Sequence, residues 1–198
     1  MVASPPSARR EELLELAYRY VLEHGLVGVS LRPLAAAVGS SPRVLLFLFD
    51  SKDGLVQALL ARARTDELEL VEGLRRDRGG GAGLDGVARE LWAWLAASEH
   101  RRLLMLWVEG YGRSLVEPDG PWRGFASTSV DDWLAVLSAA QPSRERASLK
   151  GEARRTAVLA ILRGALLDLL ATGDVDRTTA AVDQQLVALR PRRSDRSR

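Results

Sequence analysis

The segment from Ser30 to Lys52 constrains the fold of this chain more than any other part of its sequence. It reads SLRPLAAAVGSSPRVLLFLFDSK. Ser30 is a favourable N-cap, because its hydroxyl can accept a hydrogen bond from a free amide of the turn that follows. The next residues place apolar side chains at helical spacing: Leu31, Leu34, Ala35 and Val38. A short helix of about two turns is therefore predicted after Ser30.

Three residues then predict a turn and a second helix. Gly39 can adopt the left-handed conformation that ends a helix, Ser41 can cap a new helix, and Pro42 suits a first helical position. Two helices joined by a tight, glycine-led turn form the helix-turn-helix motif. Spacing alone also fits an ordinary helical hairpin, so the flanking sequence has to distinguish the two.

The flanking sequence resembles the N-terminal DNA-binding domain of the tetracycline-repressor (TetR) family. The likeness covers about residues 9–64 and keeps spacing as well as residue type. The matching positions are Gly25, Gly28, Ser30, Arg32, Leu34, Ala35, Val38, Gly39, Leu45, Phe49, Ser51 and Lys52. The runs LRPLAAAVG, SPRVLLFLF and SKDGLV are similar to a branch of that family whose recognition helix reads roughly PRxLLYHF. The resemblance implies a DNA-binding domain that acts within a homodimer.

The rest of the chain is predicted to be helical as well. Residues 1–8 are expected to be a disordered leader. A first helix is predicted from Arg9 to about His24, and a long fourth helix, capped by Ser51, from Lys52 to about Arg76. The glycine run 79–83 is expected to be a linker. Further helices are predicted at about 84–98, 100–116, 122–140, 144–172 and 176–189.

The predicted fold class is all-α, with an N-terminal three-helix helix-turn-helix DNA-binding domain and a C-terminal helical domain for ligand binding and dimerisation. The predicted organisation is a leader (1–8), the DNA-binding domain (9–51), the helical effector-binding and dimerisation domain (52–190) and a basic tail (191–198). The tail is expected to be a solvated end.

The segment from Thr156 to Ala171, TAVLAILRGALLDLLA, is apolar on nearly every side. Such a helix must be covered on every side, yet it is too short and too charged to span a bilayer. A central core helix and a protein interface both fit this pattern. The resemblance implies the interface, because in this family the last two long helices of each protomer form a four-helix dimer interface. The predicted dimer residues are Ala157, Ala160, Ile161, Gly164 and Asp168.

A dimer can present two recognition helices to successive major grooves of a palindromic site. Arg43, the second residue of the predicted recognition helix, is the leading candidate for reading bases. Arg32 is placed to reach a phosphate or a guanine edge, and Lys52 to meet a phosphate. The alternative for each cation is a solvated surface charge, and the alternative for each serine is a capping role alone. The predicted DNA-binding residues are Ser30, Arg32, Ser41, Pro42, Arg43, Phe47, Leu48 and Lys52.

The predicted recognition helix departs from the family pattern. It carries Leu46, Phe47 and Leu48 where family members commonly carry Tyr or His, whose polar groups contact the DNA backbone. Its Leu45 and Phe49 match buried family positions, which leaves Phe47 and Leu48 partly exposed. Three interpretations stay open: contact with thymine methyl groups, weakened DNA binding, or an apolar surface that meets another protein.

Aromatic side chains gather in the second half of the chain and predict an effector pocket. Trp107 and Tyr111 lie one turn apart on one helix face, whereas Trp92 and Trp94 point to nearly opposite sides of theirs. The alternative for any one tryptophan is packing between helices. Such a pocket suits an apolar or flat aromatic effector, and a cationic one if Glu109 faces inward. The candidates are Trp92, Trp94, Met105, Trp107, Glu109, Tyr111 and Trp133.

Composition narrows the class of protein further. The net charge is +2, and the basic excess lies at the two ends of the chain, where a polyanion can be met. There is no cysteine, which excludes disulfides and thiolate sites. No Glu-x-x-His, GxSxG or Walker motif is present, so the chain is not expected to be an enzyme or to hold a cofactor or metal. The first residues contain no apolar secretory segment, so a cytoplasmic location is expected.

These expectations describe a ligand-responsive transcriptional regulator, expected to be a repressor. The resemblance implies that a homodimer binds a palindromic operator in double-stranded DNA, and that a small effector releases it by shifting the long helix after Lys52. No membrane partner is expected. The alternative is a helical dimer of the same fold with weakened DNA binding, which acts through protein or ligand contacts.

Overall fold

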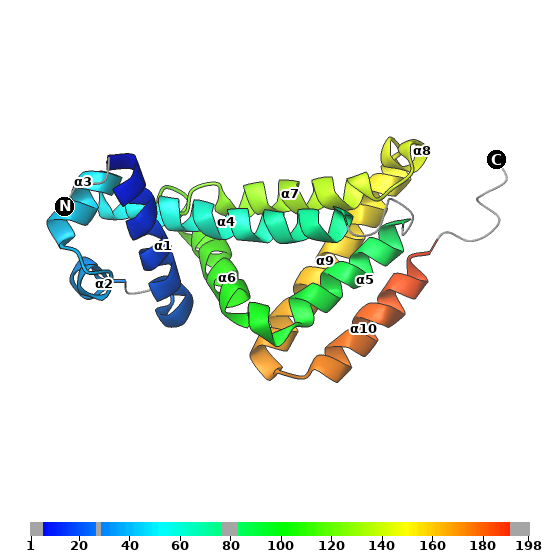
Figure 1. Cartoon of the computed structure of the whole chain (residues 1–198). Coiled ribbons are helices and arrows are strands. Elements are labelled where there is room, and N and C mark those ends of the chain that lie inside the picture. Colours follow the sequence, from blue (N-terminus) through cyan, green and yellow to red (C-terminus); the bar gives the residue numbers. More distant parts are fainter. Residues whose placement is uncertain (1–5, 27–28, 77–82, 191–198) are drawn as a thin grey trace. The chain divides into compact units, whose positions relative to one another are not determined.

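The structure is a computed structural model that describes residues 6–26, 29–76 and 83–190 of the chain. Every regular element in these ranges is helical, which confirms the all-α prediction. The elements are α1 (Pro6–His24), α2 (Leu31–Ala37), α3 (Pro42–Phe49), α4 (Lys52–Arg76), α5 (Gly83–Ala96), η1 (Ser98–His100), α6 (Arg101–Val116), α7 (Phe125–Ala139), α8 (Ser143–Arg146), α9 (Leu149–Thr172) and α10 (Val175–Ala188) (Figure 1).

Some helix ends differ from those predicted. The first helix begins at Pro6, so residues 6–8 of the predicted leader are helical. The helix predicted at 84–98 ends at Ala96, and the one predicted at 122–140 begins only at Phe125, after a turn that includes Gly124 with φ +72°. The predicted leader up to residue 5, residues 79–82 of the predicted linker and the tail at 191–198 lie outside the described residues, whereas Gly83, the last residue of that linker, begins α5.

The prediction of one continuous helix over 144–172 is wrong, because the chain breaks into α8 and α9. Ser148 caps α9 by accepting a hydrogen bond from the Gly151 amide at 3.0 Å. A Cβ atom on Gly151 would lie 1.9 Å from the Glu145 carbonyl oxygen, so only a glycine lets α8 approach this closely. The Gln141 side chain donates to the Gly151 carbonyl at 2.9 Å and holds the corner in place.

The chain divides into two compact units. The first comprises Met1–Glu69 and Arg102–Ser129, and the second comprises Leu70–Arg101 and Val130–Arg198. The predicted domain boundary after residue 51 stays a prediction.

In the first unit, α1, α2 and α3 surround a common apolar core (Figure 1). Gly39 connects α2 and α3 with φ +61°, in the left-handed conformation that the sequence predicts. Ser41 caps α3, and Ser51 caps α4 by accepting from the Gly54 amide at 2.9 Å. The fully buried side chains of this core include Leu13, Ala17, Leu34, Leu45, Leu55 and Leu59.

Polar contacts fix the middle of α4 to α1. The Tyr18 hydroxyl donates to Asp66 at 2.8 Å, and Arg62 pairs with both Asp66 and Glu15. The Arg62 guanidinium also lies 5.0 Å from the centre of the Tyr18 ring. Burial, and then the hydrogen bond to Asp66, raise the pKa of Tyr18 above its ordinary value. The phenol therefore stays a neutral donor, and α4 leaves the helix-turn-helix segment in a fixed direction.

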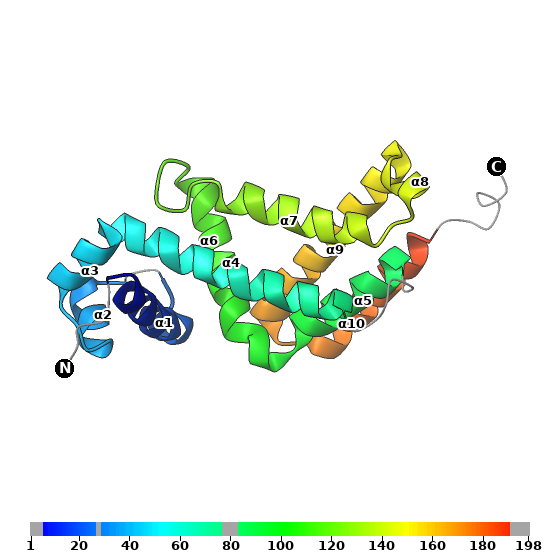
Figure 2. The same ribbon diagram turned by 45° about the horizontal axis from the view of Figure 1, so that its top comes forward.

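In the second unit, α5, α9 and α10 pack against one another (Figures 1 and 2). Their shared core includes Leu84, Ala88, Leu91, Val158, Leu162, Leu166, Val182 and Leu186. Arg154 on α9 ties this unit together, because it pairs with Asp85 at 2.6 Å and with Glu145 at 2.8 Å, and donates to the Leu189 carbonyl.

Over the ranges that the structure describes, none of the helices combines the length and the apolar character that crossing a membrane demands.

Candidate nucleic-acid interface

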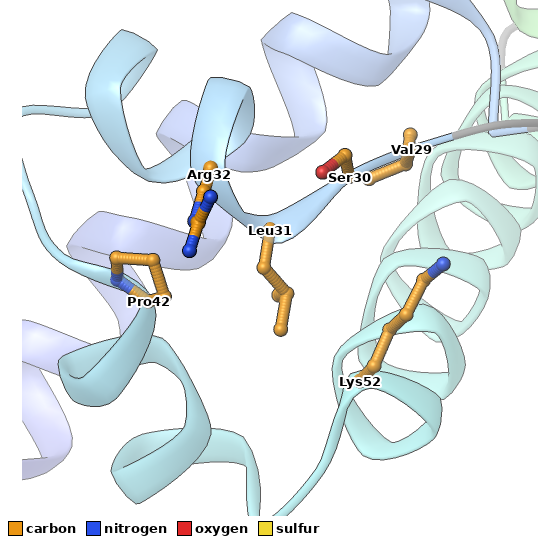
Figure 3. Close-up of a pocket in the computed structure, with 6 residues that line it drawn as sticks. All are labelled: Val29, Ser30, Leu31, Arg32, Pro42 and Lys52. Carbon is orange, nitrogen blue, oxygen red and sulfur yellow. The ribbon is translucent and has the colours of Figure 1, made fainter.

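An open groove of about 560 Å³ lies on the first unit where α2, α3 and α4 begin. It is lined by Val29, Ser30, Leu31, Arg32, Pro42 and Lys52 (Figure 3). Each helix contributes from its first turn or from the two residues before it. The structure thus brings four of the predicted DNA-binding residues, Ser30, Arg32, Pro42 and Lys52, into one surface feature.

Two cations line this groove, and a third follows one of its lining residues in the sequence. Arg32 and Lys52 lie on opposite sides of it, with Leu31 between them (Figure 3). Arg43 follows Pro42 on α3 and is exposed, as are the other two. Within the described part of the chain, none of the three forms an ion pair. Their charges are therefore available to an outside anion, as phosphate recognition requires.

The two predicted serine contacts differ in the structure. Ser41 accepts a hydrogen bond from the Val44 amide at 3.3 Å, so its hydroxyl caps α3. Ser30 occupies the N-cap position of α2, but its side chain makes no capping hydrogen bond, which contradicts the predicted capping role. The Ser30 hydroxyl instead lines the groove, where it can donate to a phosphate oxygen.

The outward face of α3 is apolar apart from Arg43. Leu45 and Phe49 are buried, as predicted from the sequence. Phe47 is 78% exposed, and Val44 and Leu46 are each 39% exposed. Leu48 is half-buried and packs against the core of the first unit. Of the three residues that depart from the family pattern, Leu46, Phe47 and Leu48, Phe47 is the most exposed.

The seven predicted ligand residues divide between the two units. Trp92, Trp94 and Trp133 belong to the second unit and are buried there. The Trp92 indole donates to Thr179 at 2.9 Å, and Trp94 stacks on His100 at 4.4 Å. These partners give the two indoles packing roles within the second unit.

The other four predicted ligand residues lie on α6 in the first unit. Trp107 donates to Ser129 at 3.0 Å and lies 5.0 Å from the Tyr111 ring, whereas Met105 is half-exposed. Glu109 accepts a hydrogen bond from the Leu26 amide at 2.9 Å through Oε2. Its other oxygen, Oε1, is buried and finds no hydrogen-bond partner among the described residues.

The small-residue face of α9 is not fully covered by the residues that the structure describes. Ala160 and Gly164 are exposed, Ala157 and Ile161 are partly exposed, and the leucines of the opposite face are buried. Asp168 accepts two hydrogen bonds of 2.7 Å from Arg177 on α10. The Arg177 guanidinium lowers the pKa of Asp168 below its ordinary value. The predicted interface role of this face stays a prediction.

Known proteins share this fold. No protein-family model matches the chain. The structure of a TetR-family transcriptional regulator from Rhodococcus sp. superimposes with a TM-score of 0.72 at 16% identity, over 92% of this chain and 98% of that one. An HTH-type transcriptional repressor of Mycobacterium tuberculosis, Rv1474c, is 30% identical over 182 residues, which are 92% of this chain and 88% of the relative.

The chain belongs to the TetR family.

A further TetR-fold structure is that of the multidrug binding protein EbrR in complex with proflavin. It matches with a TM-score of 0.70 at 25% identity, over 92% of this chain and 99% of that one. As a TetR-family protein, the chain is a transcriptional regulator that binds DNA through its helix-turn-helix motif, and not an enzyme. The resemblance inferred from the sequence is confirmed.

Sequence reasoning missed three residues of this TetR-family interface. Val29 and Leu31 line the groove, although helical spacing places Leu31 on the apolar face of its helix. Arg10 on α1 donates to the Leu48 carbonyl at 3.2 Å, and its guanidinium lies 4.8 Å from the centre of the Phe49 ring. Arg10 therefore anchors the end of α3, through a contact between segments 38 residues apart that no local pattern indicates.

Proposed function

We propose that the chain is a ligand-controlled repressor. Its homodimer binds a palindromic operator and leaves it when a small apolar or flat aromatic effector binds. The observation that carries this proposal is the groove of the first unit. Arg32 and Lys52 line it, and Arg43 follows Pro42 of its lining. All three cations are exposed and form no ion pair with the other described residues. Lys52 opens α4, so any displacement of that helix moves one wall of the groove.

The salt dependence of DNA binding tests this proposal. The operator is first located by footprinting DNA next to the protein's own gene, and affinity is then measured over a series of salt concentrations. A TetR-type regulator shows tight binding that falls steeply with salt. Because each lost phosphate contact lowers the log–log slope by about 0.9, Lys52→Ala in both protomers should lower it by about 2.

The matched control is Arg144→Ala, because Arg144 is an exposed cation of α8 with no ion pair among the described residues. This variant should keep the slope of the wild type. Weak, salt-insensitive binding by the wild type would instead support the alternative function, a TetR-fold dimer that acts through protein contacts.

The small-residue face of α9 supports the homodimer. Gly164 lies in the middle of this face, and a Cβ atom there would meet nothing within 4 Å. We expect Gly164→Leu to weaken dimerisation by about 100-fold or more, because the added side chain would separate two closely packed helices. Sedimentation equilibrium measures the dissociation constant.

Gly112→Leu is the matched control, since Gly112 is also an exposed helical glycine with nothing within 4 Å of an added Cβ atom. A dimer equally stable in both variants would show that α9 does not form the interface.

Glu109 supports an effector site that accepts cations. Its buried Oε1 has no hydrogen-bond partner among the described residues and can therefore accept one from a bound cation. The EbrR structures contain proflavin or ethidium, which are flat aromatic cations. We expect proflavin to bind and to quench tryptophan fluorescence, and Glu109→Gln to bind it about 10-fold more weakly because the ion pair is lost.

The control for this variant is Glu117→Gln. Glu117 follows the last residue of α6 and forms an ion pair with Arg113 at the surface. It should bind proflavin as the wild type does. Equal affinities of all three proteins for the dye would exclude Glu109 from the effector site.

A further inference from the structure

The outward face of α3 has an unusual chemistry for a surface that meets DNA. Among the eight residues of this helix, PRVLLFLF, Arg43 is the only one whose side chain can form hydrogen bonds. Phe47 lies one turn further along and is 78% exposed. Two helical positions four residues apart share a face, so Arg43 and Phe47 point to the same side.

The surroundings of Phe47 favour a polyanion over an apolar protein surface. Arg43 precedes it on the same face, and the groove with Arg32 and Lys52 begins at Pro42 of the same helix. These three cations are unpaired within the described chain, so docking an apolar partner here would desolvate charges that gain no counter-charge. DNA supplies phosphates for the cations at the edge of the contact and base edges at its centre.

The base edges of the major groove offer few apolar groups. Guanine, cytosine and adenine present hydrogen-bond donors and acceptors there, whereas thymine adds its C5 methyl group. A phenyl ring can form no hydrogen bond with the other groups, and it gains most by covering that methyl group. The chemistry of Phe47 therefore matches thymine and no other base.

We propose that Phe47 is a specificity-determining residue that reads the C5 methyl group of a thymine in each operator half-site. The thymine lies next to the guanine contacted by Arg43. This inference rests on the proposed function, because it requires α3 to enter the major groove of the operator.

Replacing thymine by deoxyuridine tests the inference, because uridine lacks the methyl group and keeps the same base pairing. Each thymine of the operator is replaced in turn, symmetrically in both half-sites. At one thymine position per half-site, the wild-type affinity should fall by about 15-fold, the value for two lost methyl contacts. The Phe47→Ala protein should bind the thymine and uridine operators equally.

Two further variants complete the experiment. Phe47→Leu keeps an apolar side chain and should retain part of the discrimination between thymine and uridine, whereas Arg144→Ala should retain all of it. Since Phe47 is exposed, the Phe47→Ala protein should unfold at the wild-type temperature.

The outcomes separate this inference from the proposed function. If the wild type binds the operator tightly and in a salt-dependent way, and no replacement of thymine by deoxyuridine weakens that binding, the thymine contact is overturned. The proposed repressor function then stands. The thymine contact would also be overturned if Phe47→Ala preserved the discrimination between the two operators. Absence of salt-dependent DNA binding by the wild type would overturn both.

Discussion

Replacing Arg43 by alanine is expected to lower the affinity of the dimer for its operator by about 10³-fold. A bidentate contact between arginine and guanine contributes about 1–3 kcal/mol of discrimination, and a dimer loses one such contact in each half-site. Arg43 is exposed at the second position of α3 and has no ion pair among the described residues, so none of them competes for its guanidinium. Fluorescence anisotropy with labelled operator measures the loss.

Two comparisons test whether Arg43→Ala removes a contact with a base. Affinity for unrelated DNA should fall far less, because that binding depends on phosphate contacts. Arg43→Lys should recover little of the loss, since lysine keeps the charge without the planar pair of donors. An alanine variant that binds the operator within about 3-fold of the wild type would contradict a base-reading role for Arg43.

The helix-turn-helix segment could be predicted because its determinants are local. Gly39 ends α2, and Ser41 and Ser51 cap the next two helices through bonds to amides three residues away. Such contacts depend on a few neighbouring residues, so the sequence alone indicates them. The buried positions Leu45 and Phe49 follow from helical spacing in the same way.

The features that sequence reasoning missed depend on contacts between distant segments. Glu109 is bound to the Leu26 amide, 83 residues earlier in the chain, and Arg10 anchors the end of α3. The break before α9 was missed because Gly151 matters through its approach to Glu145, and helical periodicity does not indicate such an approach.

Ser30 shows a different reason why prediction from sequence fails. Residue type and position both favour capping there, yet the Ser30 side chain makes no capping hydrogen bond, and Ser30 lines the groove. A favourable capping residue therefore need not cap its helix, even where residue type and position both predict it.

Gly54→Ala is expected to destabilise the protein by about 3 kcal/mol, because the connection between α3 and α4 has no room for a Cβ atom. At Gly54 this atom would lie 2.1 Å from the carbonyl oxygen of Phe49, so the backbone itself has to move. That carbonyl also accepts from the Ser51 amide at 2.7 Å, and Asp50 between them has φ +65°. For a chain of this size the loss corresponds to about 10 °C in the unfolding temperature, measured by circular dichroism.

The control is Gly112→Ala, at an exposed helical glycine where an added Cβ atom meets nothing within 4 Å. Alanine there should stabilise α6 by up to about 1 kcal/mol through its helix propensity. Both substitutions add a methyl group, but Gly54→Ala should lower the free energy of unfolding and Gly112→Ala should raise it.

Because the movement forced by Gly54→Ala also shifts Lys52, two residues away, we expect this variant to lose operator affinity even at temperatures where it remains folded. Unfolding of Gly54→Ala at or above the wild-type temperature would show that the turn between α3 and α4 adapts without cost, and that the groove does not depend on this close approach.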